Sequence, residues 1–231
     1  FRDTGGKSLV IELDLSSFDT SNVTDMSEMF MGCGDTSSTF TLDISSFDTS
    51  NVIDMENMFY KTGYSSPVFT LKLGDKFDTS KVTNMAVMFY QDSALTTLDT
   101  SRWDVSKVVD MHFMFRKSKF TGENTDFSNW KLDSLENAGL MFSESEYRGG
   151  NGIANWDVSN IVNMRYMFQK CIHFNDDLSK WDVSKVTDMQ GMFSFCDNFN
   201  TLFAGNANIF YKNIRRGKSV KQPRIFNLKL I

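Results

Sequence analysis

Side chains able to carry out catalysis are few in this sequence and are widely separated. The two histidines, His112 and His173, have no nucleophile or carboxylate at the spacing of a recognised catalytic motif. Glycine-rich phosphate loops, nucleophile elbows and metal-hydrolase helices are also absent from the sequence. We therefore expect no catalytic residues, no cofactor and no enzymatic activity.

Three other residue types could bind metals, but their spacing favours other roles. Aspartates recur regularly, yet the glycine-rich nonapeptide of calcium-binding repeats is absent, and capping of helical turns accounts for them. Evenly spaced methionines are typical of core packing rather than of a copper site. The three cysteines leave Cys33 remote from the other two, which argues against tetrahedral zinc. We predict no bound metal.

The cysteines share one position of a repeated sequence, and this position allows two interpretations. Cys33, Cys171 and Cys196 each lie three residues after a phenylalanine that closes a repeated block, where the other copies have Thr, Asp or Ser. A column of small buried side chains is the simpler interpretation. Because Cys171 and Cys196 belong to adjacent copies, a disulfide between them is the alternative.

One block of sequence recurs seven times and dominates the expected fold. Its first copy is Phe18-Asp-Thr-Ser-Asn-Val-Thr-Asp-Met-Ser-Glu-Met-Phe30. The seven opening aromatics lie 25 to 30 residues apart and are Phe18, Phe47, Phe77, Trp103, Trp130, Trp156 and Trp181. All the variation in length falls between a closing phenylalanine and the next opening aromatic. A constant block that alternates with a variable one is typical of a solenoid.

The pattern within each copy predicts its local structure. Val, Met, Met and Phe recur at offsets of three, three and one, which predicts one apolar side of a short helical turn. The Asp and Ser that follow the opening aromatic are expected to cap this turn. Alternating residues at 11–15, 40–44 and 69–73 predict short strands. We expect an α/β solenoid of leucine-rich-repeat type, with one parallel strand and one helical turn in each of seven repeats.

The repeated units also resemble a known family. Residues 18–26, and Trp181-Asp-Val-Ser-Lys-Val-Thr-Asp-Met-Gln-Gly-Met-Phe193, look like the repeat of BspA-like leucine-rich-repeat surface proteins, which is also found in mycoplasma lipoproteins. The resemblance covers about residues 9–200, although the fifth copy departs from the pattern at Lys131, Asp133 and Ala138. It implies a non-catalytic binding or adhesive surface and provides no catalytic residues to carry over.

The expected domains differ in charge. Residues 1–17 would form an N-terminal cap and first strand, 18–200 the solenoid, and 201–231 a basic C-terminal cap or docking segment. Seven basic and no acidic residues follow Asp197, although the whole chain carries a net charge of −5. The basic residues predicted to bind a partner are Lys212, Arg215, Arg216, Lys218, Lys221 and Arg224. The loop residues predicted to do so are Tyr60, Tyr64, Tyr147 and Arg148.

These features favour a surface-displayed or secreted module that binds a protein or glycan by shape. The alternative is a structural subunit of a larger intracellular or organellar assembly, docked on neighbouring subunits through its loops and basic segment. The acidic balance argues against nucleic acid as a partner. No apolar run reaches the length of a membrane-spanning helix. Because the chain begins at Phe1, we expect a fragment or a processed product.

Overall fold

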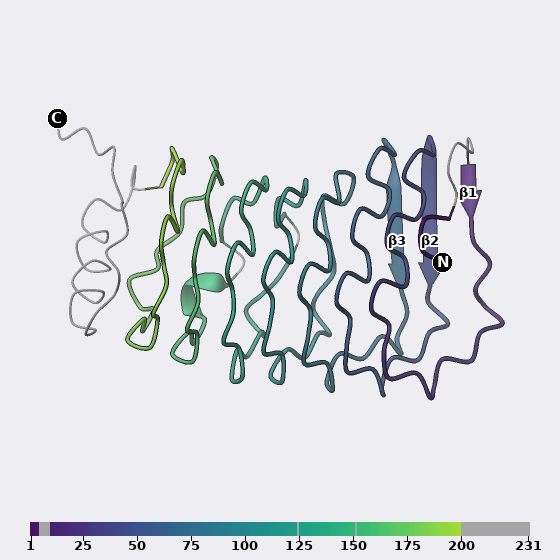
Figure 1. Ribbon diagram of the computed structural model, residues 1–231, viewed down its shortest axis with the longest axis horizontal. Coiled ribbons are helices and arrows are strands. Elements are labelled where there is room, and N and C mark those ends of the chain that lie inside the picture. Colours follow the sequence, from purple (N-terminus) through teal and green to yellow (C-terminus); the bar gives the residue numbers. More distant parts are fainter. Residues whose placement is uncertain (5–9, 124, 151, 200–231) are drawn as a thin grey trace.

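Successive turns of the chain lie side by side along the long axis of the molecule (Figure 1). This computed structural model describes residues 1–4, 10–123, 125–150 and 152–199. Within them, the regular elements are the strands β1 (Val10–Glu12), β2 (Thr39–Ile44) and β3 (Phe69–Leu73) and one 3-10 helix, η1 (Ile153–Asn155). The rest of the described chain is turns and connecting segments.

The three strands form a parallel sheet in the order β1-β2-β3. Its register pairs Ile11 with Phe40 and Phe40 with Phe69, so equivalent residues of consecutive copies lie side by side. The strands predicted at residues 40–44 and 69–73 are therefore confirmed, whereas the strand predicted at residues 11–15 is observed only at Val10–Glu12. After β3, the described part of the chain forms no further strand, so the prediction of one strand in each of the seven repeats is wrong for the last four. The segment from Phe89 to Trp103 is three to four residues shorter than the segments that hold β2 and β3, so it lacks the length to continue the sheet.

The predicted helical turn in each copy is wrong. The segment forms consecutive β-turns instead, with the Met29 N–H donating to the Met26 carbonyl (3.3 Å) and the Cys33 N–H to the Phe30 carbonyl (3.0 Å). The third residue of each turn has a positive φ, 56° at Glu28 and 68° at Gly32, as a type II turn requires.

Hydrogen bonds between copies explain why a helix does not form. The N–H groups of Met26, Glu28 and Phe30 donate to carbonyls of the next copy, at 3.0, 2.8 and 2.9 Å. Isolated parallel bridges join the same position from copy to copy: Asp25, Asp54, Asn84, Asp110, Asn137, Asn163 and Asp188. The amides that would close helical turns are thus used to hold neighbouring copies together.

The carboxylates of each copy serve these turns rather than a helix. Asp19 Oδ1 accepts the Ser21 N–H (3.0 Å), and Asp25 Oδ1 accepts the Ser27 N–H (2.8 Å). Equivalent bonds span two residues at Asp54 and Asn84, so these side chains form Asx turns. Hydrogen bonding by Ser27 lowers the pKa of Asp25, which keeps the acceptor ionised.

Aromatic rings form two continuous stacks through the core. Ring centroids of successive closing phenylalanines are 5.2 to 5.9 Å apart and the rings are nearly parallel; the stack comprises Phe30, Phe59, Phe89, Phe115, Phe142, Phe168 and Phe193. The opening tryptophans stack as well, and the centroids of Trp130 and Trp156 are 5.9 Å apart. These stacks bury most of the apolar side chains of the copies against their neighbours, although Phe18 in the first copy is exposed. A single copy cannot bury its apolar side alone.

One position of the repeat carries backbone strain that differs between copies. Residues two before the closing phenylalanine have a positive φ: Glu28, Asn57, Val87, Phe113, Leu140, Tyr166 and Gly191. Val87, with φ of 63°, is β-branched and suits this region least. Because asparagine tolerates the left-handed region, we expect Val87→Asn to raise the free energy of unfolding by about 1 kcal/mol. Urea denaturation measures this change, and a loss of stability would contradict the assigned turn.

Candidate interaction site at the edge of strand β3

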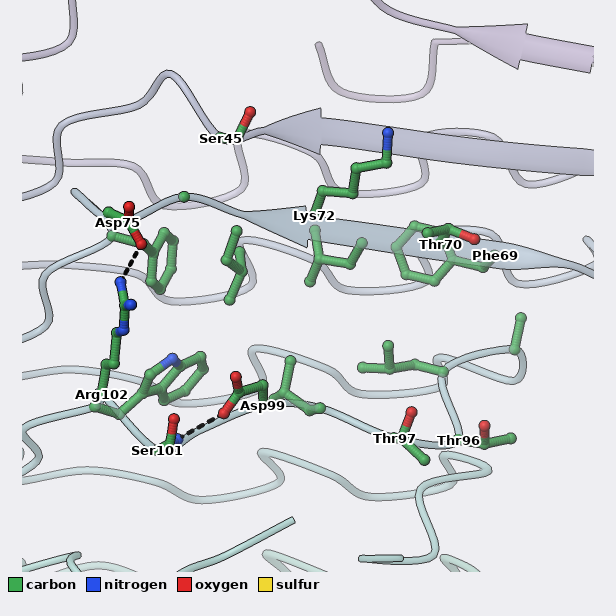
Figure 2. A pocket seen from close by; sticks show the side chains of 18 residues that line it. Ser45, Phe69, Thr70, Lys72, Asp75, Thr96, Thr97, Asp99, Ser101 and Arg102 are labelled. Atoms are coloured by element: carbon green, nitrogen blue, oxygen red, sulfur yellow. Dashed lines mark hydrogen bonds and ion pairs between the residues drawn. The ribbon is translucent and has the colours of Figure 1, made fainter. Parts of the chain in front are cut away.

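A pocket of about 760 Å³ lies where the sheet ends, between β3 and the segment of residues 94–103. Figure 2 shows β3 along one side of this pocket and Thr96, Thr97 and Asp99 along the other. The apolar lining includes Phe69, Leu71, Leu73, Leu95, Leu98 and Trp103. The pocket therefore marks the change from copies that contain a strand to copies that do not.

Close packing and hydrogen bonds position both walls of the pocket. At the end of β3, a Cβ atom on Gly74 would overlap the Ser45 carbonyl oxygen, so only glycine permits this approach to the preceding copy. In the opposite wall, Asp92 Oδ1 accepts the Leu95 N–H at 3.0 Å and the Ala94 N–H at 3.3 Å. The buried Asp92 carboxyl thus holds the beginning of that wall in place.

The side chains of β3 are less covered than their equivalents in β2. Phe40, Leu42 and Ile44 are fully buried, whereas Leu71 and Leu73 are partly exposed. The difference arises because β2 lies between two strands, whereas β3 has a neighbouring strand on one side only. The exposed apolar surface on β3 is therefore the surface that a further strand would cover.

Charged residues surround the end of the pocket near Leu73. Lys72 Nζ lies 3.2 Å from Asp43 Oδ2, and the Arg102 guanidinium pairs with Asp75 (Figure 2). Asp99 has no cationic partner within salt-bridge distance in the described chain, and its Oδ1 accepts the Ser101 N–H at 3.0 Å. This backbone hydrogen bond lowers the pKa of Asp99, so its carboxylate is ionised at neutral pH. The charge of Arg102, which pairs with Asp75, also lowers the pKa of Asp99. Two carboxylates therefore share one guanidinium, and this end of the pocket carries an excess of negative charge.

Groups suited to acid–base chemistry lie outside this pocket. His112 Nδ1 is 2.8 Å from Asp110 Oδ1 within one Asx turn, and this hydrogen bond raises the pKa of His112. Burial opposes ionisation of Asp110, but its hydrogen bonds to His112 outweigh burial and lower its pKa. His173 Nε2 is 3.8 Å from Glu146 Oε2. Among the residues that the structure describes, no cluster of three or more His, Cys, Asp or Glu side chains could hold a metal ion.

The loop residues predicted to bind a partner have different environments. Tyr60 stacks on Tyr90 with centroids 5.2 Å apart, and Lys61 Nζ lies 5.3 Å from the Tyr60 ring and 5.7 Å from the exposed Tyr64 ring. Arg148 is exposed. Both Tyr60 and Tyr64 lie outside the pocket lining and form a separate aromatic and cationic surface.

Tyr147 was predicted as a contact residue, and this prediction is wrong. Its side chain is fully buried, with its ring stacked 4.3 Å from Phe142, so it belongs to the core. The Tyr147 ring packs against the phenylalanine stack, although the sequence predicted that this residue lies in a loop. The predicted basic contacts Lys212, Arg215, Arg216, Lys218, Lys221 and Arg224 lie outside the described residues.

The disulfide considered between Cys171 and Cys196 is not formed. Both thiols are free and buried, and each donates to the carbonyl of a closing phenylalanine in the preceding copy: Cys171 to Phe142 (2.9 Å) and Cys196 to Phe168 (2.6 Å). Thr62 makes the same bond to Phe30 through its hydroxyl (2.8 Å). In these three copies the position holds a small side chain that donates a hydrogen bond, whereas Asp92 at the same position accepts two backbone N–H groups.

We expect Cys171 to resist alkylation in the folded protein. Burial raises the pKa of its thiol to about 12, so almost no reactive thiolate exists at pH 8. Mass spectrometry after iodoacetamide treatment should show modification in urea but not in native buffer. Cys171→Ser should change the free energy of unfolding by less than about 1 kcal/mol, because serine can donate the same hydrogen bond. Equal labelling of native and unfolded chains would contradict the buried position.

The pocket residues of β3 and of the opposite wall were not predicted as a site. The alternation at residues 69–73 indicated the strand, but not that one of its edges lacks a neighbour. The shorter segment between Phe89 and Trp103 is the signal that could have located this break.

Together, the stacked turns, the ladder of backbone hydrogen bonds and the aromatic core define a repeat protein whose copies stabilise one another. The chain belongs to the family described as Mycoplasma protein of unknown function, DUF285, whose family model matches residues 6–69, 63–151 and 120–209. Neither a curated protein nor a solved structure matches the chain significantly. Within the described residues, no helix has the length and apolar character needed to span a membrane.

Proposed function

We propose that this chain is a BspA-like, leucine-rich-repeat-like solenoid of seven repeats that acts as a non-catalytic interaction or adhesion module at a cell surface. The observation that carries the proposal is the partly apolar pocket beside β3, held between walls that hydrogen bonds and close packing position. Concave apolar sites with a few polar groups are typical binding sites.

A second feature supports binding through a rigid surface. Backbone ladders and ring stacks run from copy to copy, so side chains on the outside keep a constant relative position. Recognition residues on such a scaffold lose little conformational entropy when a partner binds. Tyr60, Lys61 and Tyr64 form an aromatic and cationic surface that would add a second contact region.

The proposal is tested with the purified chain on immobilised extracellular proteins and glycans. We expect saturable binding to at least one protein or glycan, lost after heat denaturation, and antibody labelling of unpermeabilised source cells. Absence of binding across both panels, or labelling only after permeabilisation, would overturn the proposed surface function.

A further inference from the structure

We propose that the free edge of β3 binds an extended peptide segment of a partner protein, which adds a fourth parallel strand to the sheet. This inference rests on the proposed interaction function and specifies the chemistry of the partner. The segment has apolar side chains at alternate positions and a basic residue toward its carboxyl end.

The register of the sheet shows which backbone groups are available. The Phe40 N–H donates to the Val68 carbonyl at 2.9 Å, while Phe40 itself lies opposite Phe69. In a parallel ladder, successive residues direct their N–H and C=O groups to opposite edges. Phe69, Leu71 and Leu73 therefore direct theirs away from β2 and toward the pocket side. Within the described chain, no residue of segment 94–99 forms a backbone hydrogen bond with them.

Such an edge attracts another strand for a physical reason. Unpaired backbone donors and acceptors beside an apolar surface gain from pairing, because hydrogen bonds form as the apolar side chains lose water. The equivalent residues of β2 show the outcome, since Phe40, Leu42 and Ile44 are fully buried between two strands. An added strand would cover Leu71 and Leu73 in the same manner.

The size of the pocket fits a short strand. β3 has five residues, and a strand of this length extends about 17 Å. The volume of about 760 Å³ lies within the range of small-ligand binding pockets, so the pocket would enclose the part of the strand whose side chains face it. The far wall supplies Leu95, Leu98 and Trp103, so apolar side chains of the added strand would contact both walls.

Charge determines which end of the added segment is basic. Lys72 and Arg102 already have carboxylate partners, whereas Asp99 has no cationic partner within salt-bridge distance in the described chain. Asp99 lies toward the carboxyl end of β3 (Figure 2). A parallel strand would bring its own carboxyl end to the same place, where a lysine or arginine would neutralise Asp99.

The test uses a fluorescent peptide, Thr-Phe-Thr-Leu-Thr-Ile-Lys, which keeps the alternation of β2 and adds the basic end. Fluorescence anisotropy with the full chain should show saturable binding. In each of two N-methylated versions of the peptide, one set of alternate amides is blocked. We expect methylation of the set that faces β3 to weaken binding by at least about tenfold. No saturable binding of the parent peptide, or equal binding of all three peptides, would overturn strand addition.

Protein variants locate the peptide on β3. Leu71→Glu places a charge in the pocket and should weaken binding by at least about tenfold. Thr41→Glu, on β2 and outside the pocket lining, is the control and should change binding less than about threefold. Circular dichroism verifies that both variants fold. Asp99→Asn should weaken binding of the lysine peptide about threefold and leave binding of a peptide that ends in glutamine unchanged. Equal losses of peptide binding in Leu71→Glu and Thr41→Glu would place the peptide elsewhere.

Different experimental outcomes would refute the interaction function and the strand-addition site. Binding to the protein or glycan panels without peptide binding would leave the interaction function in place and refute the strand-addition site. Loss of panel binding in Leu71→Glu, but not in Thr41→Glu, would show that the natural partner uses this edge.

Discussion

Replacing Asp92 with asparagine should stabilise the protein by several kcal/mol at pH 8 and have almost no effect near pH 4. Asp92 is fully buried, and its Oδ2 has no hydrogen-bond partner among the described residues. Burial raises the pKa of this carboxyl from 3.8 to about 8. The folded protein therefore keeps Asp92 protonated at a pH where the unfolded chain has released the proton.

Proton linkage determines whether the stability rises or falls with pH. Stability from a carboxyl with a raised pKa is fully present below pH 3.8 and is lost as the pH rises to about 8. A shift of this size corresponds to about 6 kcal/mol at about 1.4 kcal/mol per pKa unit. The substituted asparagine would carry no charge in either state, so the variant should show no such loss. Its amide oxygen could still accept the N–H groups of Ala94 and Leu95, as Asp92 Oδ1 does.

Urea denaturation of both proteins from pH 5 to pH 8 measures this effect. That range lies above the window in which carboxylates with lowered pKa values, such as Asp25, lose their stabilising effect as the pH falls. Asp133→Asn, at an exposed position, is the matched control and should leave the pH dependence unchanged. Parallel pH profiles for wild type and Asp92→Asn would show that Asp92 is not the buried acid described above.

The second large effect is expected from the centre of the phenylalanine stack. Phe115 is fully buried, and its ring lies 5.5 Å from both Phe89 and Phe142 and 4.4 Å from Phe120. Phe115→Ala removes these contacts and leaves a cavity that the surrounding ladder cannot readily fill. We expect the free energy of unfolding to fall by about 4 kcal/mol.

The control is another phenylalanine of the same repeat array. Phe195 is 68% exposed, so Phe195→Ala should change stability by less than about 0.5 kcal/mol. Urea denaturation followed by circular dichroism compares both variants with the wild type. Equal losses of stability in Phe115→Ala and Phe195→Ala would mean that the stacked rings do not stabilise the core.

The sequence alone determined which side chains face inward. The columns of Val, Met, Met and Phe predicted the core, and Val52, Met55, Met58 and Phe59 are all fully buried. Alternation also located β2 and β3. Side-chain periodicity was sufficient here because burial depends mainly on which residues are apolar and how they are spaced.

Only the tertiary structure decided how the backbone satisfies its hydrogen bonds. The spacing of Met26, Met29 and Phe30 would bury these side chains equally well in a helical turn and in consecutive β-turns. Spacing alone therefore cannot distinguish the two structures. The choice follows from the next copy, whose carbonyls accept the N–H groups of Met26 and Phe30. The burial of Asp92 and Tyr147 and the free edge of β3 likewise depend on neighbours distant in sequence. These features arise only when the copies stack, because each copy completes the hydrogen bonds and the core of the one before it.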